Sequence, residues 1–564
     1  MRAVLLTLLL VACVNGGFFS SLCDKVKKTF GGEGSVGEKL KNFTTAKIIK
    51  IKKIFGSTSV MRIHERLSKL KDKVKKMLEL TPKMLAALKE RLAKLRPIKH
   101  VQVNEMGDSI EEVNQKSEVG GYLFQGDIVL TEEQANEVEK DIDDVTSGNP
   151  RNRRQAFKDR RYPTTIWEHG VNYYFDYNAN PKLRSVFKKG ANEWEKNTCI
   201  NFKEDREAAD KIRVFYEKGC WSFVGRRGGK QDLSLGRGCD SIATATHELG
   251  HALGFYHTMS RHDRDNYITV NIYNIKPNLY DQFTKQTTST NENYNITYDY
   301  GSIMNYGGRA GSYNRETVIV PNDVNYQETL GGPFLAFYDI LMMNTHYNCL
   351  DKCNNDTRAA NCKMGGFPHP RDCARCICPS GYGGPLCDQR PSGCGQVLQA
   401  SKEYQNLTST IGNPNKQEQE DFEICNYWVE SPAGTQIEVR IDKLSGRFAV
   451  EGCRYFGVEL NTQKDQMATG YRFCAKEDED ISLLAHTNRV PIVAYSRVAQ
   501  TDITIQYRYV TDGKPGPKAT TPRPTLPPGQ KCEDSVACTQ NICKSKVLTK
   551  EIKMGMCPKL CGFC

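Results

Sequence analysis

The apolar residues near the amino terminus follow two different patterns. A nearly continuous apolar run over residues 4–12, followed by Gly16 and Gly17, has the length of a secretory signal core and predicts a signal peptide over residues 1–16. Further along, Thr81 and Pro82 precede apolar positions at helical spacing, which predicts an amphipathic helix capped by Thr81. Those apolar positions are Met84, Leu85, Leu88, Leu92 and Leu95.

The rest of the chain divides into units of different composition. Residues 155–350 are globular in composition, and a compact block of six cysteines occupies residues 351–388. Residues 394–510 alternate aromatic and β-branched positions with polar ones, which predicts a domain of strands. Residues 512–531 carry six prolines among Thr, Gly and Lys and predict an extended linker. Residues 532–564 hold six cysteines and too few apolar residues for a core, so disulfides must hold this tail together.

The composition is that of an ordinary multidomain globular protein. The 564 residues suffice for about three to four domains, and 39% are hydrophobic and 26% charged. The net charge of +12 is concentrated in residues 24–100, which hold 22 Lys or Arg against 7 Asp or Glu, whereas residues 101–154 hold 5 against 13. Since the chain after these segments is nearly balanced, we expect no nucleic-acid partner. No later apolar run reaches membrane-spanning length, so we expect no transmembrane segment.

The basic front segment admits two interpretations. A basic amphipathic helix can bind an anionic membrane, and the segment would then be a membrane-active product. The alternative, which we favour, is a solvated helical prosegment that is discarded. A boundary for it exists, because Arg151-Asn152-Arg153-Arg154 has the form of a proprotein-convertase site. We therefore expect a propeptide over residues 17–154 and a cut after Arg154 by a proprotein convertase.

The cysteines indicate an oxidising compartment. Of the 22 cysteines, only Cys13 and Cys23 precede Cys199, and the others continue to the last residue. Residues 10–13 also resemble a bacterial lipobox, but the sequons and the later modules favour a secreted, extracellular protein. The sequons, which are candidate glycosylation sites, lie at Asn42, Asn295, Asn355 and Asn406.

The run His-Glu-Leu-Gly-His-Ala-Leu-Gly-Phe-Tyr-His carries the predicted chemistry. His247 and His251 lie four positions apart, so on a helix they share one face and can both bind zinc. Gly254 permits the positive backbone torsion that turns the chain back and lets His257 supply a third nitrogen. Three protein ligands leave zinc an open position, as in catalytic sites. Glu248 can then act as the general base on a water that the zinc activates.

This run resembles the metzincin motif, and its continuation over residues 261–265, Arg-His-Asp-Arg-Asp, is similar to the astacin family of zinc metalloendopeptidases. Residues 300–306, Tyr-Gly-Ser-Ile-Met-Asn-Tyr, resemble the astacin Met-turn. The resemblance implies an α+β metzincin catalytic domain with an active-site helix and one zinc. It also implies that Met304 lies beneath the zinc and that Tyr306 is a displaceable metal ligand that stabilises the transition state.

Other stretches resemble further parts of an astacin precursor. Residues 124–127, Phe-Gln-Gly-Asp, are by themselves a turn, but they resemble the aspartate switch, which implies that Asp127 keeps the zymogen inactive at the zinc. Residues 220–227 resemble the cleft-rim strand that pairs with an extended substrate. Two positions depart from the family. Thr258 stands where a Glu commonly pairs with the mature amino terminus, and Asn305 replaces the usual His of the Met-turn.

The units after the peptidase region resemble extracellular modules. Residues 351–388 resemble an EGF-like domain, residues 394–510 a CUB β-sandwich, and residues 532–564 a ShK-toxin-like domain, an order similar to that of nematode astacins. A zinc cluster is the alternative for Cys-x-x-Cys-x-Cys, and potassium-channel block is the alternative to an interaction role for the tail. The CUB-like unit lacks the usual Asp after Cys453, so we expect no calcium there. The resemblances imply disulfides joining Cys199–Cys349, Cys220–Cys239, Cys353–Cys373, Cys362–Cys376, Cys378–Cys387, Cys394–Cys425, Cys453–Cys474, Cys532–Cys564, Cys538–Cys557 and Cys543–Cys561.

Together these features predict a secreted, zymogen-activated zinc metalloendopeptidase. Its expected substrates are extracellular proteins of matrix, cuticle or eggshell, an expectation that rests on analogy. The alternative is a non-catalytic, matrix-binding scaffold. The presence of all three histidines, Glu248 and Tyr306 favours the enzyme.

Overall fold

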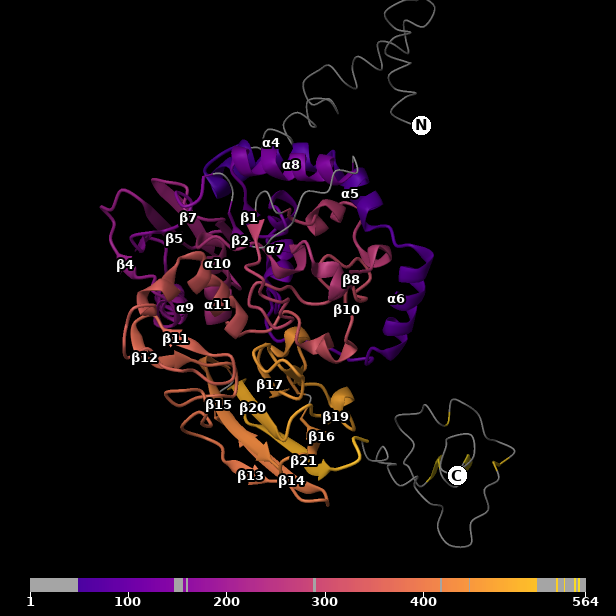
Figure 1. Cartoon of the computed structure of the whole chain (residues 1–564). Coiled ribbons are helices and arrows are strands. Elements are labelled where there is room, and N and C mark those ends of the chain that lie inside the picture. The colour runs from indigo at the N-terminus through magenta and orange to yellow at the C-terminus, as the bar shows by residue number, and fades with distance from the viewer. Residues whose placement is uncertain are drawn as a thin grey trace, which may run out of the picture.

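Figure 1 shows the chain as a computed structural model. The structure describes residues 49–146, 156–158, 161–287, 291–415, 418–445 and 447–514, together with isolated positions between residues 534 and 557. The expected signal peptide, Asn42, the Arg154 cleavage site and most of the linker lie outside the described residues. Each disulfide expected in the tail also involves at least one residue outside them.

The central domain is built on a six-stranded sheet with the order β1-β6-β7-β5-β3-β4. β6 runs antiparallel to β7, and the other neighbours are parallel. The edge strand β1 comes from the amino-terminal segment and pairs with β6, with Ile128 opposite Ser222. The strands are β1 (Ile128–Val129), β3 (Val171–Phe175), β4 (Phe202–Glu204), β5 (Lys211–Phe215), β6 (Cys220–Phe223) and β7 (Lys230–Leu235).

Two helices pack together beside this sheet. α10 (Ile242–Ala252) begins where the Ser241 side chain accepts a hydrogen bond from the backbone of the first turn. α9 (Pro181–Asn197) approaches α10 closely at Gly190, where a Cβ atom would lie only 2.9 Å from the Cβ of Ala245. A larger residue at that position would push the two helices apart, so this glycine helps to fix α10, on which the predicted site lies.

The second half of the central domain has little regular structure. Short antiparallel pairs join β2 (Ala156–Phe157) to β9 (Asn291–Glu292) and β8 (Ile268–Val270) to β10 (Ile319–Pro321). The domain ends with α11 (Phe337–His346). Single helical turns fill the connections: η2 (Thr258–Ser260), η3 (Arg264–Asn266), η4 (Ile272–Asn274), η5 (Tyr280–Phe283), η6 (Val324–Glu328) and η7 (Cys349–Cys353).

The basic helices of the amino-terminal segment pack on an acidic helix of the same segment. α4 (Ser59–Ser68) and α5 (Lys71–Leu78) contact α8 (Glu132–Thr146), and α4 lies beside α8 in Figure 1. The expectation of a solvated helix is therefore wrong for α4 and α5. Their basic side chains pair with acidic side chains of α8, and their apolar faces are buried. The ion pairs join Arg62 to Glu132, Arg66 to Glu132 and Glu139, and Lys73 to Asp143. The buried side chains of α4 and α5 are Val60, Ile63, Leu67, Val74 and Leu78.

The helix predicted after Thr81 is present as α6 (Pro82–Lys94). Its cap is the expected one, since the Thr81 side chain accepts a hydrogen bond from the amide of Met84. The predicted apolar face is only partly covered: Leu88 is buried, whereas Met84 is 40% exposed. Two further helical elements, α7 (Ile110–Lys116) and the turn η1 (Gly120–Tyr122), lead toward β1.

A β-sandwich follows the central domain. Its five-stranded sheet has the order β13-β15-β20-β17-β18, and its four-stranded sheet has the order β14-β21-β16-β19. A buried ion pair joins Arg472 to Glu459 at 2.9 Å. The strands are β13 (Val397–Gln399), β14 (Gln405–Ile411), β15 (Glu418–Glu430), β16 (Gln436–Leu444), β17 (Phe456–Leu460), β18 (Tyr471–Phe473), β19 (Ser482–Leu484), β20 (Arg489–Val498) and β21 (Thr501–Val510), with the turns η8 (Glu451–Cys453) and η9 (Lys476–Asp478).

Between the two domains lies a small hairpin of β11 (Phe367–His369) and β12 (Asp372–Ile377). Three disulfides hold this module, and two more lie in each of the flanking domains. The bonds join Cys199–Cys349, Cys220–Cys239, Cys353–Cys373, Cys362–Cys376, Cys378–Cys387, Cys394–Cys425 and Cys453–Cys474. These are the pairs that the family resemblances imply for this part of the chain.

Two expectations from the sequence concern the surface of the molecule and a membrane span. The sequon residues Asn295, Asn355 and Asn406 are exposed. Among the described residues, no helix combines the length and the apolar character needed to span a bilayer.

Candidate metal centre

The buried helix α10 supplies two of the three histidines. His247 and His251 lie one turn apart on it, as their spacing predicts. After the helix ends, Gly254 has a φ of 116°, which reverses the chain and brings His257 back to the same centre. All three imidazoles are at most 3% exposed.

The three imidazoles converge on one carboxylate, that of Asp127. One oxygen of Asp127 lies 3.0 Å from Nε2 of His247 and 3.2 Å from Nε2 of His257, and the other lies 3.4 Å from Nε2 of His251. The four side chains form one compact group whose ligand atoms all lie within 4.8 Å of one another. The structure thus brings together the three predicted ligands and the predicted switch residue.

A hydrogen bond from Nδ1 orients each of the three imidazoles. Nδ1 of His247 donates to the carbonyl of Ile303 at 2.7 Å, and Nδ1 of His251 donates to the carbonyl of Phe255 at 2.7 Å. Nδ1 of His257 donates to the side-chain carbonyl of Gln125 at 2.9 Å. Because Nδ1 carries the proton in each ring, each Nε2 has its lone pair free for a metal.

The donor set and the unsatisfied atoms around it fit a zinc ion. Three imidazole nitrogens and one carboxylate oxygen make up the four ligands that zinc prefers. Among the described residues, Nε2 of His251 and one oxygen of Asp127 have no hydrogen-bond partner. Buried polar atoms are rarely left unsatisfied, so these atoms indicate a group that binds there.

Glu248 is completely buried beside this centre. Neither of its carboxylate oxygens has a hydrogen-bond partner among the described residues. Burial, together with the charge of Asp127, raises the pKa of Glu248 well above its usual value. A carboxylate that is free of partners and ready to take up a proton has the properties of a general base.

The predicted Met-turn lies against α10 at Gly250. Met304 is fully buried, and its sulfur would lie 2.5 Å from a Cβ atom placed on Gly250. The Tyr306 ring faces the site, with its centre 4.2 Å from that of His257. Its hydroxyl donates a hydrogen bond to the main-chain carbonyl of Gln125 at 2.9 Å, so the amino-terminal segment holds Tyr306 in this state.

The two positions that depart from the family pattern have partners of their own. The hydroxyl of Thr258 forms a hydrogen bond of 2.8 Å with that of Ser302 in the turn. The side chain of Asn305 donates to the carbonyl of Tyr300 at 3.2 Å and accepts from the hydroxyl of Tyr298 at 3.2 Å. These contacts give the turn local hydrogen bonds without the usual Glu and His.

Two supporting residues were not found from the sequence. Asp339, on α11, is buried and accepts hydrogen bonds from the Ser302 hydroxyl at 2.6 Å and the Ile303 amide at 2.8 Å, and thereby fixes the turn. Asn114, on α7, is also fully buried and links the stretch before Asp127 to strand β6. The contacts that matter for the site join Asp339 to residues 36 and 37 positions away and Asn114 to Cys220, 106 positions away, so spacing along the chain does not reveal them. The one local contact of Asp339, with the Ala336 amide, marks only the start of α11.

A helix that presents two histidines, a third histidine after a turn and a free glutamate define a zinc metallopeptidase. Residues 159–348 match the model of the family Astacin (Peptidase family M12A). The chain is 43% identical over 472 residues to zinc metalloproteinase nas-31 of Caenorhabditis elegans, covering 82% of this chain and 77% of that relative. The chain belongs to the astacin family and is a zinc metalloendopeptidase with one zinc.

Two solved structures are similar to separate parts of the chain. One is high choriolytic enzyme 1, a hatching enzyme zinc-protease from Oryzias latipes (Medaka fish), with 33% identity over 34% of this chain and 94% of that one and a TM-score of 0.30. The other is the MASP-1 CUB2 domain bound to Ca²⁺, with 15% identity over 21% of this chain and 99% of that one and a TM-score of 0.15.

Proposed function

We propose that this chain is the secreted zymogen of a zinc endopeptidase that acts on extracellular proteins and is activated by a convertase cut after Arg154. The observation that carries the proposal is the position of Asp127 between the imidazoles of His247, His251 and His257. Although burial acts in the opposite direction, the neighbouring histidines hold the pKa of Asp127 well below its usual value, so it remains an anion suited to a metal. Seven disulfides among the described residues support an oxidising, extracellular setting.

In the mature enzyme the three histidines would hold zinc, which supplies Lewis acidity and lowers the pKa of a water molecule. Glu248 takes the proton from the attacking water on one of its free oxygens and passes it to the leaving amine. Tyr306, once separated from Gln125, donates its hydroxyl hydrogen bond to the oxygen on which negative charge develops.

Substrate binding follows from the strand pairing of β6. In the zymogen β1 occupies the edge of β6, and departure of β1 frees that edge for main-chain pairing with an extended substrate. Main-chain pairing tolerates many sequences, which suits an endopeptidase of matrix, cuticle or eggshell proteins.

The remaining modules act outside the catalytic step. We assign the EGF-like unit to residues 351–388, the CUB unit to 394–510 and the ShK-like tail to 532–564, after the linker of 512–531. The three disulfides around the β11–β12 hairpin support the EGF-like assignment. The two-sheet sandwich supports the CUB assignment. Glycans on Asn295, Asn355 and Asn406 would lie on the surface.

Cleavage of casein and denatured collagen, measured before and after convertase treatment, tests this proposal. We expect activity to appear only after treatment, and an Arg154→Ala chain to remain inactive in the same assay. Equal activity of the uncut chain would contradict the zymogen.

A further inference from the structure

Residues 96–101, here called the strap, lie between the central domain and the β-sandwich, and the site that they occupy is here called the groove. The strap connects α6 to the stretch that leads to α7, and it touches both domains. The amide of Arg96 donates to the side chain of Gln327 at 2.9 Å, and the Gln327 side chain donates back to the Arg96 carbonyl at 3.0 Å. On the other side, the amide of Val101 donates to the carbonyl of Ala449 at 2.9 Å. Main-chain groups of the strap thus bind both domains, and the amide of Ile98 donates to the carbonyl of Arg96 at 2.9 Å, which closes a tight turn at Pro97.

An arginine site lies at one end of the groove. The guanidinium of Arg96 forms an ion pair of 2.6 Å with Asp478 of the sandwich, and the two side chains are only 11% and 0% exposed. The same guanidinium lies 5.2 Å from the centre of the Phe473 ring, within cation–π range. The other oxygen of Asp478 accepts two main-chain amides, so this carboxylate is fixed in position before any ligand arrives.

A second cation site lies at the other end. Nε2 of His100 is 2.9 Å from the carboxylate of Glu328 in the central domain, and these side chains are 10% and 1% exposed. Glu451 of the sandwich adds a nearby carboxylate, which also accepts the backbone amide of Arg309. The groove therefore combines carboxylates from both domains.

An apolar position separates the two cation sites. Ile98 is 5% exposed and packs with Ala449 and Ala475 of the sandwich. The strap thus presents Arg96, then the apolar Ile98 two positions later and the basic His100 after two more. Every contact that selects this pattern comes from residues after the proposed cleavage site.

Removal of the strap would leave Asp478 and Glu328 without their cationic partners. Buried carboxylates are costly to leave unpaired, so the vacated groove would favour another segment that carries cations at the same spacing. Asp478 and Glu328 would pair with such cations in another chain as well as in this one.

We propose that, in the mature enzyme, this groove is a docking site for a basic segment of the protein substrate, separate from the zinc ligands. The inference rests on the proposed release of the residues before 155. It assigns substrate selection to a surface shared by the peptidase domain and the sandwich, with Asp478 as the main determinant for arginine.

Direct binding tests the groove on the full mature chain carrying Glu248→Ala. The probe is a labelled peptide of the strap sequence, Arg-Pro-Ile-Lys-His-Val, measured by fluorescence anisotropy. We expect binding that weakens at least tenfold with Asp478→Asn or with Gln in place of the peptide's arginine. The exposed control Asp502→Asn should change nothing. The peptide substitution keeps the test valid even if Asp478→Asn misfolds, and absence of binding, or equal binding of both peptides, would overturn the inference.

Kinetics then separate docking from catalysis. A fluorogenic peptide cleaved by the mature enzyme is compared with the same peptide carrying the strap sequence on a flexible linker. We expect KM to fall at least tenfold with kcat unchanged, and Asp478→Asn to remove the difference. Equal KM values with normal cleavage would overturn the docking site alone, whereas failure to cleave either peptide would contradict the proposed function.

Discussion

The side chain of Asn114 forms hydrogen bonds to both main-chain groups of Cys220. Its amide donates to the Cys220 carbonyl at 2.7 Å, and its carbonyl accepts from the Cys220 amide at 2.7 Å. The same side-chain amide also donates to the carbonyl of Gly126 at 2.9 Å. A single buried residue therefore ties the position next to Asp127 to strand β6, beside the zinc site.

Replacement of Asn114 by Ala should loosen the inhibitory segment. Each buried main-chain group left unpaired costs about 1–3 kcal/mol, so Asp127 should leave the centre more often. In a chain made uncleavable by Arg154→Ala, we expect basal hydrolysis of a short peptide to rise at least about tenfold. The exposed Lys116→Ala, whose hydrogen bond stays within the amino-terminal segment, serves as the control, and an unchanged basal rate in Asn114→Ala would show that Asn114 does not hold the switch.

Loss of the Asp127 carboxylate should have a larger effect. In the uncleavable chain, Asp127→Ala removes the anion from between the three histidines and leaves the position to water. We expect measurable peptidase activity without any cut, still below that of the processed enzyme because Gln125 keeps its contact with Tyr306. If Asp127→Ala remains as silent as its parent while retaining zinc, steric blockage alone explains latency.

The cut prosegment should be held more tightly at low pH. Burial opposes it, but the charge of Glu328 raises the pKa of His100 above its usual value, with Glu451 acting in the same direction and Arg309 against it. A group with a raised pKa binds more protons in the complex than when free, so its contribution is full at low pH and is lost as pH rises through the raised value.

Gel filtration of the processed protein measures this effect. The fraction of prosegment that elutes with the enzyme should fall between pH 6 and pH 8, by at most about tenfold in affinity per pH unit for one proton. In His100→Gln this part of the pH dependence should disappear. Retention that rises with pH would contradict the assignment.

Asp339 should be needed for a rigid Met-turn. Asp339→Ala leaves the Ser302 hydroxyl and the amides of Ile303 and Ala336 without their buried acceptor, at about 1–3 kcal/mol for each group. Since the Ile303 carbonyl orients His247, we expect weaker zinc retention as well as a lower unfolding temperature. Thermal unfolding and metal analysis test both effects, and Asp339→Asn, which keeps one acceptor, should lie between wild type and Asp339→Ala.

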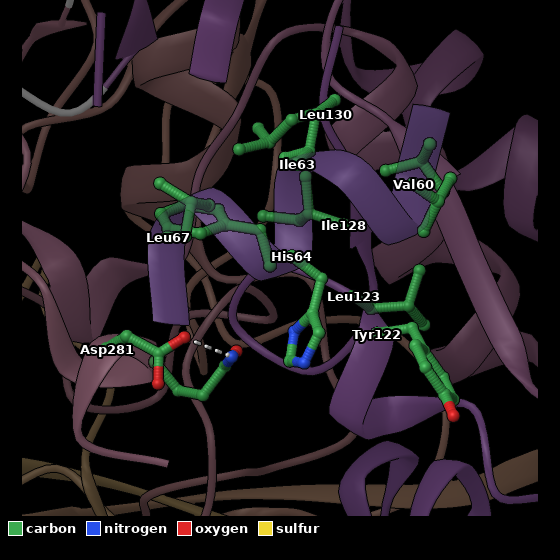
Figure 2. Close-up of a pocket in the computed structure, with 12 residues that line it drawn as sticks. Val60, Ile63, His64, Leu67, Tyr122, Leu123, Ile128, Leu130 and Asp281 are labelled. Atoms are coloured by element: carbon green, nitrogen blue, oxygen red, sulfur yellow. Dashed lines mark hydrogen bonds between the residues drawn. The ribbon is translucent and has the colours of Figure 1, made fainter. Parts of the chain in front are cut away.

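The sequence predicted those parts of the molecule that local spacing determines. The four-residue interval between His247 and His251, the turn at Gly254 and the cap at Thr81 each depend on neighbours in the chain. The packing of α4 and α5 on α8 could not be predicted in this way, because the pairing of Arg66 with Glu139 joins residues 73 positions apart. The cavity in Figure 2 is a second example, because it is lined by α4 residues such as Ile63 together with Leu123 and Ile128, which are distant from α4 along the chain.

The most direct test of the central claim is the activity of the processed chain beside its Glu248→Gln variant, with the zinc content of both measured. This substitution keeps the size of the side chain and removes the base. We expect equal zinc, one ion per chain, and a loss of peptide hydrolysis of about a hundredfold or more in the variant. Full activity of Glu248→Gln with zinc in place would contradict the role of Glu248 as the general base of this site.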